Sequence, residues 1–415
     1  MSQLTNALID VLETGDVKTD RTGTGTVSKF GRLMRFSLLN DWWPVETTRK
    51  VAWMKTIEEL QWFMKGGIHE SFLAEKKNHI WGSWTGQDGT IGPMYGEQWR
   101  NWTTGLLGLE GVDRERLEKM LYDRALNFDS VTLTVEESMG VVDEFLKERR
   151  KPYEQGGRAG IDQLAEVVHL LRNNPDSRRI IVSTWNTPLM PDTFMSPSEN
   201  VDAGNMALAP CHTLWQVNTA PLSLMDKLIQ IILQKPDEDS LCAIALAEAN
   251  PVLMGETAST IHAVRRVALE RFCNADPRFL PHDKQLEALN ANGMKAIREW
   301  NTTGRPQRKL SLMLFARSQD LPLGTVFNIP CYAMLAKYLA HITNMVPFEY
   351  IHVMGDYHIY LNQIEQVNEQ IQRSDMATPK AVLDPSMKEI EDFDPLKIQV
   401  TYESHPAIKY PMAAI

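Results

Sequence analysis

The order of helix-like and strand-like segments predicts an α+β fold, in which helices surround a mixed β-sheet. Two observations support this prediction. Segments with an apolar residue every three or four positions, typical of helices, are interspersed with segments that alternate apolar and polar residues, typical of strands. Two further stretches, 105–158 and 223–308, are charged and helix-prone, and we expect them to be helical insertions into one domain that spans 1–415.

The helical periodicity is clearest in 50–65, where apolar residues stand three or four positions apart. Glu58 and Glu59 are neighbours in this helix and point about 100° apart, so only one of them can share the apolar face. The other predicted helices are 3–13, 161–172, 331–343 and 359–373.

Strand-like alternation is found in 27–38, 179–185, 309–316, 349–354 and 397–402. A further alternating run follows Pro210. Because proline fixes φ and lacks an N–H donor, we expect Pro210 to mark the edge or the start of a strand and to place Cys211 at a defined, accessible point. The glycine- and tryptophan-rich segment 78–102 is expected to be a loop.

Composition excludes several classes of protein. The net charge of −10 does not favour general nucleic-acid binding. The four cysteines show neither CxxC pairs nor a zinc-type spacing, which predicts a reduced, cytoplasmic protein without a metal. The N-terminus lacks the pattern of a signal peptide, and no stretch is long enough to span a membrane.

Cys211 is the first candidate for chemistry. One interpretation is a buried structural cysteine, and the other is a nucleophile. His212 cannot easily act as its base, because neighbouring strand residues face opposite sides of a sheet. Activation would then come from cations such as Arg178, Arg179 and Arg317, whose guanidinium groups also match phosphate; solvated surface arginines are the alternative.

Other polar residues fit a small phosphorylated ligand. Arg21 lies in a Gly-Thr-rich turn whose amides could approach an anion, although an ordinary turn has the same pattern. Asn328 stands alone in an apolar run and could read a pyrimidine edge or cap a helix. His358 and Tyr360 could bind a sugar hydroxyl, or His358 could be an ordinary turn histidine. These residues together predict a cysteine nucleophile acting on a phosphate-bearing ligand.

Ten stretches of the chain resemble the thymidylate synthase family. They occur in the family's order and extend over nearly the whole chain outside 105–158 and 223–308. Any one match would be weak evidence, whereas the complete ordered set is specific. The stretches are 20–26, 57–63, 80–84, 92–99, 176–186, 207–216, 317–320, 327–332, 355–360 and 405–415.

The resemblance implies that Cys211 adds as a thiolate to C6 of deoxyuridylate (dUMP). Asn328 would stabilise the developing C4 enolate oxygen, aided by water that Glu59 and His358 hold. C5 would then attack the methylene carbon of the co-substrate 5,10-methylenetetrahydrofolate, and Glu59 and Tyr95 would assist proton movement. The implied catalytic residues are Cys211, Glu59, Tyr95, Asn328 and Asp320.

The same resemblance implies two binding sets and no metal. The nucleotide set is Arg21, Arg178, Arg179, His212, Arg317, Ser318, Asn328, His358 and Tyr360. The folate set is Ile80, Trp81, Trp84, Asp320, Leu323, Gly324, Phe327 and Ala414. Family members are homodimers in which the adjacent arginine pair reaches the partner's active site, so the resemblance implies a homodimer with shared sites.

The exocyclic methylene that the family mechanism forms on the base has two possible fates. Thymidylate synthases reduce it with hydride from the folate, whereas related hydroxymethylases add water and release tetrahydrofolate. Water exclusion near the folate decides between them. Trp81 fits hydride transfer, and Asn328 favours uracil over cytosine. Departures from the synthase pattern lie near the folate, at Ala52, Gly82, Ala316, Pro322 and Ala413.

These departures and the two insertions favour a dUMP hydroxymethyltransferase, of the type that bacteriophages use to make modified DNA precursors in the host cytoplasm. The alternative is a thymidylate synthase that gives dTMP and dihydrofolate. An alternative of another class is a catalytically silent nucleotide-binding protein. The complete set of candidate catalytic residues argues against a silent protein.

Overall fold

The computed structural model describes residues 2–19, 23–102, 160–234 and 257–411. The chain divides into two compact units. The first is made of Met1–Gln61, Val168–Ile181 and Cys211–Ile415, and the second of Trp62–Val167 and Val182–Pro210. The predicted insertion 105–158 lies outside the described residues.

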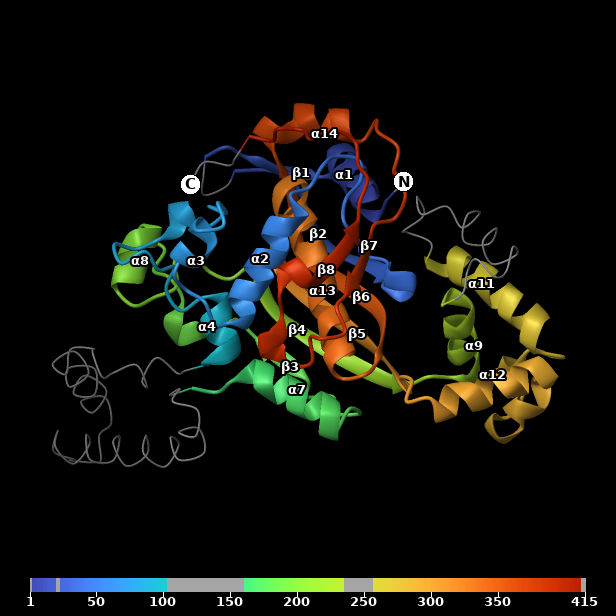
Figure 1. The fold of residues 1–415 in the computed structure, drawn as a ribbon. Helices are drawn as coiled ribbons and strands as arrows, with labels where there is room; N and C mark the ends of the chain where they lie inside the picture. The colour runs from blue at the N-terminus through green and yellow to red at the C-terminus, as the bar shows by residue number, and fades with distance from the viewer. Residues whose placement is uncertain (1, 20–22, 103–159, 235–256, 412–415) are drawn as a thin grey trace, which may run out of the picture. The chain divides into compact units, whose positions relative to one another are not determined.

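A six-stranded mixed sheet is the centre of the fold (Figure 1). Its order is β1-β2-β6-β5-β4-β3. Strands β5 and β6 pair in parallel, whereas β1 with β2, β2 with β6 and β4 with β5 pair antiparallel. The predicted α+β class with a mixed sheet is confirmed. The strands are β1 (Asp16–Lys18), β2 (Thr26–Ser37), β3 (Ile181–Ser183), β4 (His212–Pro221), β5 (Arg308–Asp320) and β6 (Val346–Tyr360).

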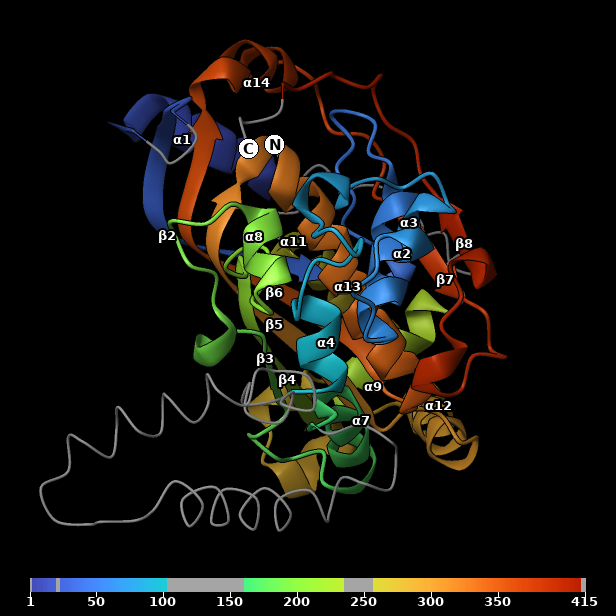
Figure 2. The same ribbon diagram turned by 90° about the vertical axis from the view of Figure 1, so that its left-hand side faces the viewer.

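Helix α13 (Val326–Ile342) connects the parallel strands β5 and β6 and packs on both (Figure 1, Figure 2). A parallel pair needs such a crossover, because a tight hairpin cannot join the strand ends. The helix is apolar around its whole circumference, and nearly all of its residues are buried. Pro330 lies inside the helix, four residues after Val326, and cannot donate the N–H bond that would reach the Val326 main-chain oxygen.

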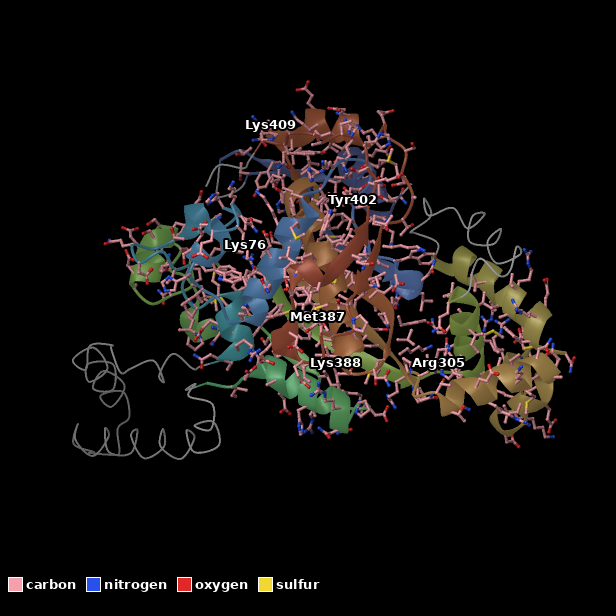
Figure 3. The ribbon with its side chains drawn as sticks, viewed as in Figure 1. Lys76, Arg305, Met387, Lys388, Tyr402 and Lys409 are labelled. Atoms are coloured by element: carbon pink, nitrogen blue, oxygen red, sulfur yellow. The ribbon has the colours of Figure 1, made fainter. Side chains whose placement is uncertain are left out.

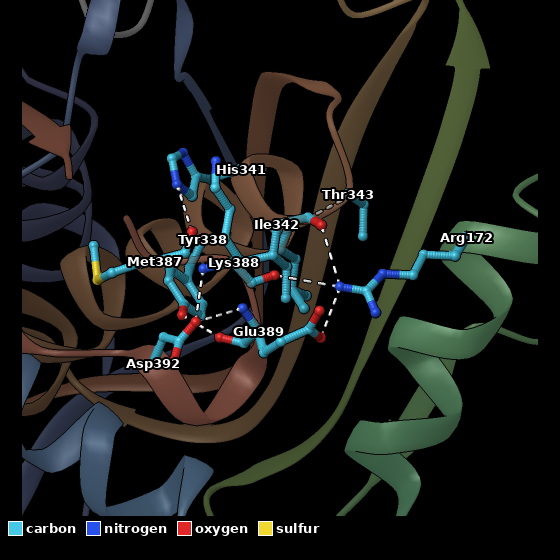
Figure 4. Close-up of polar contacts among 10 residues, drawn as sticks. Arg172, Tyr338, His341, Ile342, Thr343, Met387, Lys388, Glu389 and Asp392 are labelled. Atoms are coloured by element: carbon cyan, nitrogen blue, oxygen red, sulfur yellow. Dashed lines mark hydrogen bonds and ion pairs between the residues drawn. The ribbon is translucent and has the colours of Figure 1, made fainter. Parts of the chain in front are cut away.

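The C-terminal half of α13 is held by contacts with residues 387–389 (Figure 4). The Tyr338 hydroxyl donates to the main-chain oxygen of Glu389, and His341 Nε2 lies 2.9 Å from the main-chain oxygen of Met387. Arg172 donates to the main-chain oxygen of Ile342 at 3.4 Å and to the Glu389 carboxylate at 2.9 Å. These contacts prevent α13 from shifting along its own axis, and they therefore also fix the position of its first turn.

The other helices of the first unit begin and end close to the predicted positions where periodicity was strong. They are α1 (Gln3–Thr14), α2 (Trp53–Met64), which continues into the second unit, the C-terminal part of α7 (Gln163–Asn173), and α14 (Ile364–Gln370). The helix predicted over 359–373 starts later, because β6 runs to Tyr360 and a short 3-10 turn, η10 (Leu361–Gln363), follows it.

The described part of 223–308 is helical. Its helices are α9 (Leu224–Leu233), α11 (Thr257–Phe272) and α12 (Ala291–Thr302), with the 3-10 turns η7 (Pro277–Phe279) and η8 (His282–Ala288). They share a core that includes Leu228, Ala268 and Trp300 and that extends to Leu39 and Val346 beside the sheet. That this region is an insertion stays a prediction.

Several short elements were not predicted. The segment 78–102 is not a simple loop, since it contains the 3-10 turn η2 (Gly82–Trp84) and helix α4 (Tyr95–Arg100). A two-stranded sheet pairs β7 (Lys380–Leu383) with β8 (Ile398–Thr401), and only the second of these strands was expected. Elements as short as η2, α4 and β7 do not show a periodic pattern in the sequence. The second unit also holds α3 (Ser71–Ala74) and α8 (Pro197–Asp202).

After β8 the chain runs without helix or strand to residue 411 and carries Tyr402 and Lys409 (Figure 3). This C-terminal segment is pinned to the first unit. The His405 N–H donates to the Thr47 main-chain oxygen at 2.9 Å, and Arg373 donates to the Pro406 main-chain oxygen at 2.6 Å. None of the described helices is long and apolar enough to cross a membrane.

Candidate functional site

Cys211 lies immediately before β4, as the position of Pro210 predicts. The Arg317 N–H donates to the Cys211 main-chain oxygen at 2.8 Å, which joins the residue to β5. The β4–β5 register shifts between His212 and Leu214, so a β-bulge turns the backbone next to the cysteine. The side chain of Cys211 is partly exposed, whereas Cys331 on α13 is buried. Cys211 is therefore joined to β5 through its main chain, and the residue keeps part of its surface exposed.

Electrostatics around the thiol differ from the expectation. Burial raises the pKa of Cys211, and the nearby Asp320 carboxylate raises it further. The Arg317 guanidinium lowers the pKa but does not outweigh burial. Arg317 is thus a cation that lowers the thiol pKa, as expected, but the net shift is upward because burial removes the thiol from water.

His212 is buried and faces the interior, away from a role as base for Cys211. Its Nδ1 lies 3.1 Å from the Tyr332 hydroxyl oxygen, and the two rings meet edge to face. Burial lowers the pKa of His212 to about 4, while a hydrogen bond with Asn328 acts in the opposite direction. The imidazole is therefore neutral at pH 7.

Asn328 lies in the first turn of α13. The capping alternative is wrong, because Thr325 occupies the cap position and the helix begins at Val326. Its Nδ2 donates to Gln319 Oε1 at 3.2 Å, and the Thr325 hydroxyl donates to the same oxygen at 3.0 Å. Gln319 is buried and orients the Asn328 amide. Sequence reasoning missed Gln319, although it stands inside the quoted stretch 317–320.

Strands β5 and β6 bring four candidate residues to one end of the sheet. Asp320 pairs with His358 in the parallel register, and Ser318 pairs with Asp356. His358 and Tyr360 pack edge to face, 5.2 Å apart. Both lie within β6, not after it, so the turn-histidine alternative is wrong.

Asp356, which no prediction singled out, orients His358. Its Oδ1 lies 2.8 Å from His358 Nδ1, and Lys18 Nζ lies 3.3 Å from Oδ2. The hydrogen bond with His358 is the largest cause that lowers the pKa of Asp356. Because the carboxylate accepts this hydrogen bond, the proton of the imidazole lies on Nδ1, and Nε2 is the ring nitrogen left to contact a ligand.

Close approach at this end of the sheet depends on Gly355. A Cβ on this residue would stand 2.7 Å from the Arg317 main-chain oxygen. The glycine therefore lets β6 lie tightly against the β5 residue that hydrogen-bonds Cys211.

The predicted phosphate ligands are only partly brought together. Arg317 is exposed on β5 beside Cys211. Arg178 and Arg179 lie at the exposed turn between α7 and β3, and among the described residues no hydrogen bond or ion pair engages either guanidinium group. Arg21 lies outside the described residues. The turn that follows Arg21 reaches this end of the sheet, since the Leu361 N–H donates to the Gly25 main-chain oxygen at 3.0 Å.

Helix α2 buries Glu59, which has 7% of its surface exposed, whereas the neighbouring Glu58 is partly exposed. The expectation that only one of them joins the apolar face is confirmed. Burial raises the pKa of the Cys331 thiol well above its usual range, and the Glu59 carboxylate adds to that effect. Glu59 therefore points toward the N-terminal half of α13, which also carries Asn328.

The predicted folate-binding residues of the first unit surround a short π-helical turn, η9 (Leu321–Thr325). Asp320 caps this turn by accepting from the Leu323 N–H at 2.9 Å. Burial raises the pKa of Asp320. Leu323, Gly324 and Phe327 are partly exposed around it. The predicted residue Ala414 lies outside the described residues.

Comparison with known proteins identifies the family. The family model described as thymidylate synthase matches residues 2–244 and 279–414. The chain belongs to the thymidylate synthase family. It is 29% identical over 411 residues to the thymidylate synthase of Francisella philomiragia subsp. philomiragia, an alignment that covers 99% of this chain and 98% of that protein.

In this thymidylate synthase family member, two of the remaining candidates, Tyr95 and Trp81, belong to an aromatic cluster within the second unit. Tyr95 begins α4 and is buried; its ring lies 5.0 Å from Phe63 and 5.9 Å from Trp81. Trp81 and Trp84 are partly exposed, and Ile80 is exposed. The cluster holds Trp81 through ring contacts while part of its surface stays available to a ligand.

The described parts of the chain contain no candidate metal centre. No group of three His, Cys, Asp or Glu side chains among those residues is placed to hold an ion.

Proposed function

We propose that the protein is a thymidylate synthase that converts dUMP and 5,10-methylenetetrahydrofolate into dTMP and dihydrofolate. Members of the family transfer a one-carbon unit to dUMP. The observation that carries the proposal is the hydrogen-bonded join between Cys211 and Arg317, with Asn328 oriented by Gln319 beside them. This arrangement offers a nucleophile, a phosphate ligand and an amide that reads uracil.

In the proposed reaction Cys211 sulfur bonds to C6 of dUMP, and the electron pair of the C5–C6 double bond moves toward the C4 oxygen. The second N–H of the Asn328 amide, which Gln319 leaves available, would donate to that oxygen. Because burial raises the pKa of the Cys211 thiol, thiolate formation depends on Arg317, the cation that lowers this pKa. His212 stays neutral and supports Asn328.

The residues around η9 fit a folate. A pterin presents N–H donors on one edge, and the enclosed Asp320 carboxylate is an acceptor with partly exposed apolar neighbours in Leu323 and Phe327. When bound, the folate supplies the methylene carbon and the hydride that reduces it. We assign Asp320 to pterin binding and Glu59 and Tyr95 to proton movement.

The hydroxymethyltransferase hypothesis rested on departures near the folate. The comparisons favour the synthase, since a relative that aligns along nearly the whole chain is named a thymidylate synthase. Mass analysis of the nucleotide product decides between them. Incubation with dUMP and methylenetetrahydrofolate should give a methyl product and one dihydrofolate, seen by absorbance, per nucleotide. A 5-hydroxymethyl product with tetrahydrofolate would overturn the proposal.

A catalytically silent protein is tested with 5-fluorodeoxyuridylate and methylenetetrahydrofolate. The intact protein should form a covalent adduct, and the Cys211→Ala variant should form none. The Cys331→Ala variant is a matched control, because the Cys331 thiol that it removes is buried on α13. Absence of labelling in the intact protein would support the silent alternative.

A homodimer is part of the same proposal. One support is the exposure of two apolar side chains of β2, Phe30 at 83% and Leu33 at 50%. On β5 the residues that alternate with the core, including Met313 and Phe315, are partly exposed. The family is typically homodimeric and cytoplasmic, and we propose both for this chain.

Shared active sites are tested by complementation. Inactive Cys211→Ala and Arg179→Ala variants should regain activity when they are mixed and allowed to exchange subunits, because one of the two sites in a mixed dimer would be intact. Sedimentation should show a dimer. A monomer, or mixed variants that stay inactive despite exchange, would contradict the shared site.

A further inference from the structure

The Gln363 side chain connects three parts of the proposed site. It ends the turn η10 and has no exposed surface. Its Oε1 accepts from the Tyr360 N–H at 3.3 Å. Its Nε2 donates to Asp320 Oδ2 at 3.4 Å and to the Pro411 main-chain oxygen at 3.2 Å. Tyr360 is a proposed sugar ligand and Asp320 the proposed pterin ligand.

The contacts determine the orientation of the Gln363 amide. A glutamine amide has two N–H donors and one acceptor oxygen, and each kind of atom faces a partner of the right type here. A flipped amide would direct N–H groups at the Tyr360 N–H and its oxygen at the Asp320 carboxylate. Both contacts would then be repulsive, so the observed orientation is the one that satisfies the site.

Asp320 depends on this amide for the position of its second oxygen. The Leu323 N–H donates to Oδ1 at 2.9 Å, and the Gln363 amide donates to Oδ2 at 3.4 Å. Among the described residues, the charged or titratable groups that face Asp320 include Arg49, Cys211, His358 and Tyr410. Arg49 adds positive charge and also donates to the Pro322 main-chain oxygen in η9.

Another anchor of the C-terminal segment makes no hydrogen bond to Asp320. The Tyr410 hydroxyl donates to Gln370 Oε1 at 2.7 Å, and Gln370 Nε2 donates to the Thr48 hydroxyl at 2.9 Å. Gln370 is fully buried, like Gln363. The two glutamines therefore hold the same segment, and only Gln363 also holds the carboxylate.

We propose that Gln363 is a positioning residue for the folate: its amide sets the Asp320 carboxylate and couples that carboxylate to the seating of the C-terminal segment at Pro411. The inference rests on the proposed function, because it takes Asp320 as the pterin ligand. Gln363 acts through Asp320 and is expected to affect the affinity for folate much more than the affinity for dUMP.

The Gln363→Glu variant tests the donor role. It keeps the shape of the side chain and the acceptor for Tyr360, and it replaces the donor with a carboxyl group next to Asp320. Two neighbouring carboxyl groups share one proton, and this proton restores a donor at low pH. At about pH 8 the KM for methylenetetrahydrofolate should be about tenfold that of the wild type. At about pH 6 it should be no more than about threefold that of the wild type.

Two further variants separate positioning from general stability. The shorter side chain of Gln363→Asn cannot bring its N–H donor to Asp320, and it adds no charge. The KM of this variant for folate should therefore rise by about the same factor at both pH values. Gln370→Glu is the matched control: a buried amide that holds the same segment becomes a carboxyl group away from Asp320, and the ratio of its folate KM to that of wild type should not depend on pH. All variants should keep the KM for dUMP within about twofold of wild type.

Two outcomes would overturn the inference. One is a folate KM of Gln363→Glu and Gln363→Asn that equals that of wild type. The other is a pH-dependent rise in Gln370→Glu that matches the rise in Gln363→Glu. Failure of the proposed function is distinguishable, because the wild-type protein would then form no adduct with 5-fluorodeoxyuridylate and folate.

Discussion

Replacing the buried Lys337 with methionine should stabilise the protein in a pH-dependent way. Lys337 lies on α13 with 3% of its side chain exposed. Among the described residues its Nζ makes no hydrogen bond, and the nearest carboxylate oxygen, from Asp41, is 3.9 Å away. Burial lowers the pKa of Lys337 from 10.5 to about 8. At pH 7 the group is therefore still charged and poorly solvated.

The two pKa values set the size of the effect. Their difference corresponds to about 3 kcal/mol of stability lost at pH 7. Between about pH 8 and pH 10.5 the unfolded chain binds more protons at this site than the folded chain, so the stability of the wild type rises with pH in that window. Methionine has a similar volume and carries no charge. The advantage of Lys337→Met should thus be about 3 kcal/mol at pH 7 and about 1 kcal/mol near pH 10.

Urea unfolding of both proteins at several pH values between about 7 and 10 measures this difference. Other groups that titrate in the range cancel when the two proteins are compared at the same pH. The reasoning would be refuted by a difference in unfolding free energy that does not change with pH. It would also be refuted by a variant that is less stable than the wild type at pH 7.

Three further changes test the site. Gln319→Leu removes the acceptor that orients Asn328 and should raise the KM for dUMP about tenfold in steady-state kinetics; an unchanged KM would contradict this role. Gly355→Ala forces β6 away from the Arg317 main-chain oxygen and should cost about 1–3 kcal/mol in urea unfolding. The control Gly82→Ala, whose Cβ would meet no heavy atom closer than 3.7 Å, should cost less, and an equal cost in both variants would argue against strain at the contact. Asp356→Asn should lower stability near pH 7, and the difference from the wild type should shrink as the pH falls toward the lowered pKa of Asp356; a constant difference would argue against the ion pair.

The fold could be predicted from the sequence where an element has enough residues to show its period. The α2 and α7 boundaries fall within a few residues of the predicted ones. Strand β5 extends beyond the predicted 309–316 to Asp320, because polar residues at its end are held by pairing with β6. The parallel pairing of β5 and β6 is a contact between distant segments, which local periodicity does not contain.

The residues of the candidate site likewise fall into those that the sequence predicted and those that it did not. Cys211, Arg317 and Asn328 were proposed from their residue types and motifs, and the structure places them around adjoining ends of β4, β5 and α13. Gln319 and Gln363 were not proposed, because a glutamine in a strand or after a turn has no distinctive pattern. Their importance comes from what they contact, at Asn328 and at Asp320.

The sequence by itself determined the α+β class, the cysteine at the start of a strand and the resemblance to one family, because each depends on local patterns or ordered motifs. Only the tertiary structure decided the protonation tendencies of Cys211 and His212 and the orientation of Asn328 and Asp320. A pKa and a hydrogen-bond direction depend on burial and on partners that are distant along the chain. Those partners meet only when the sheet and α13 have formed.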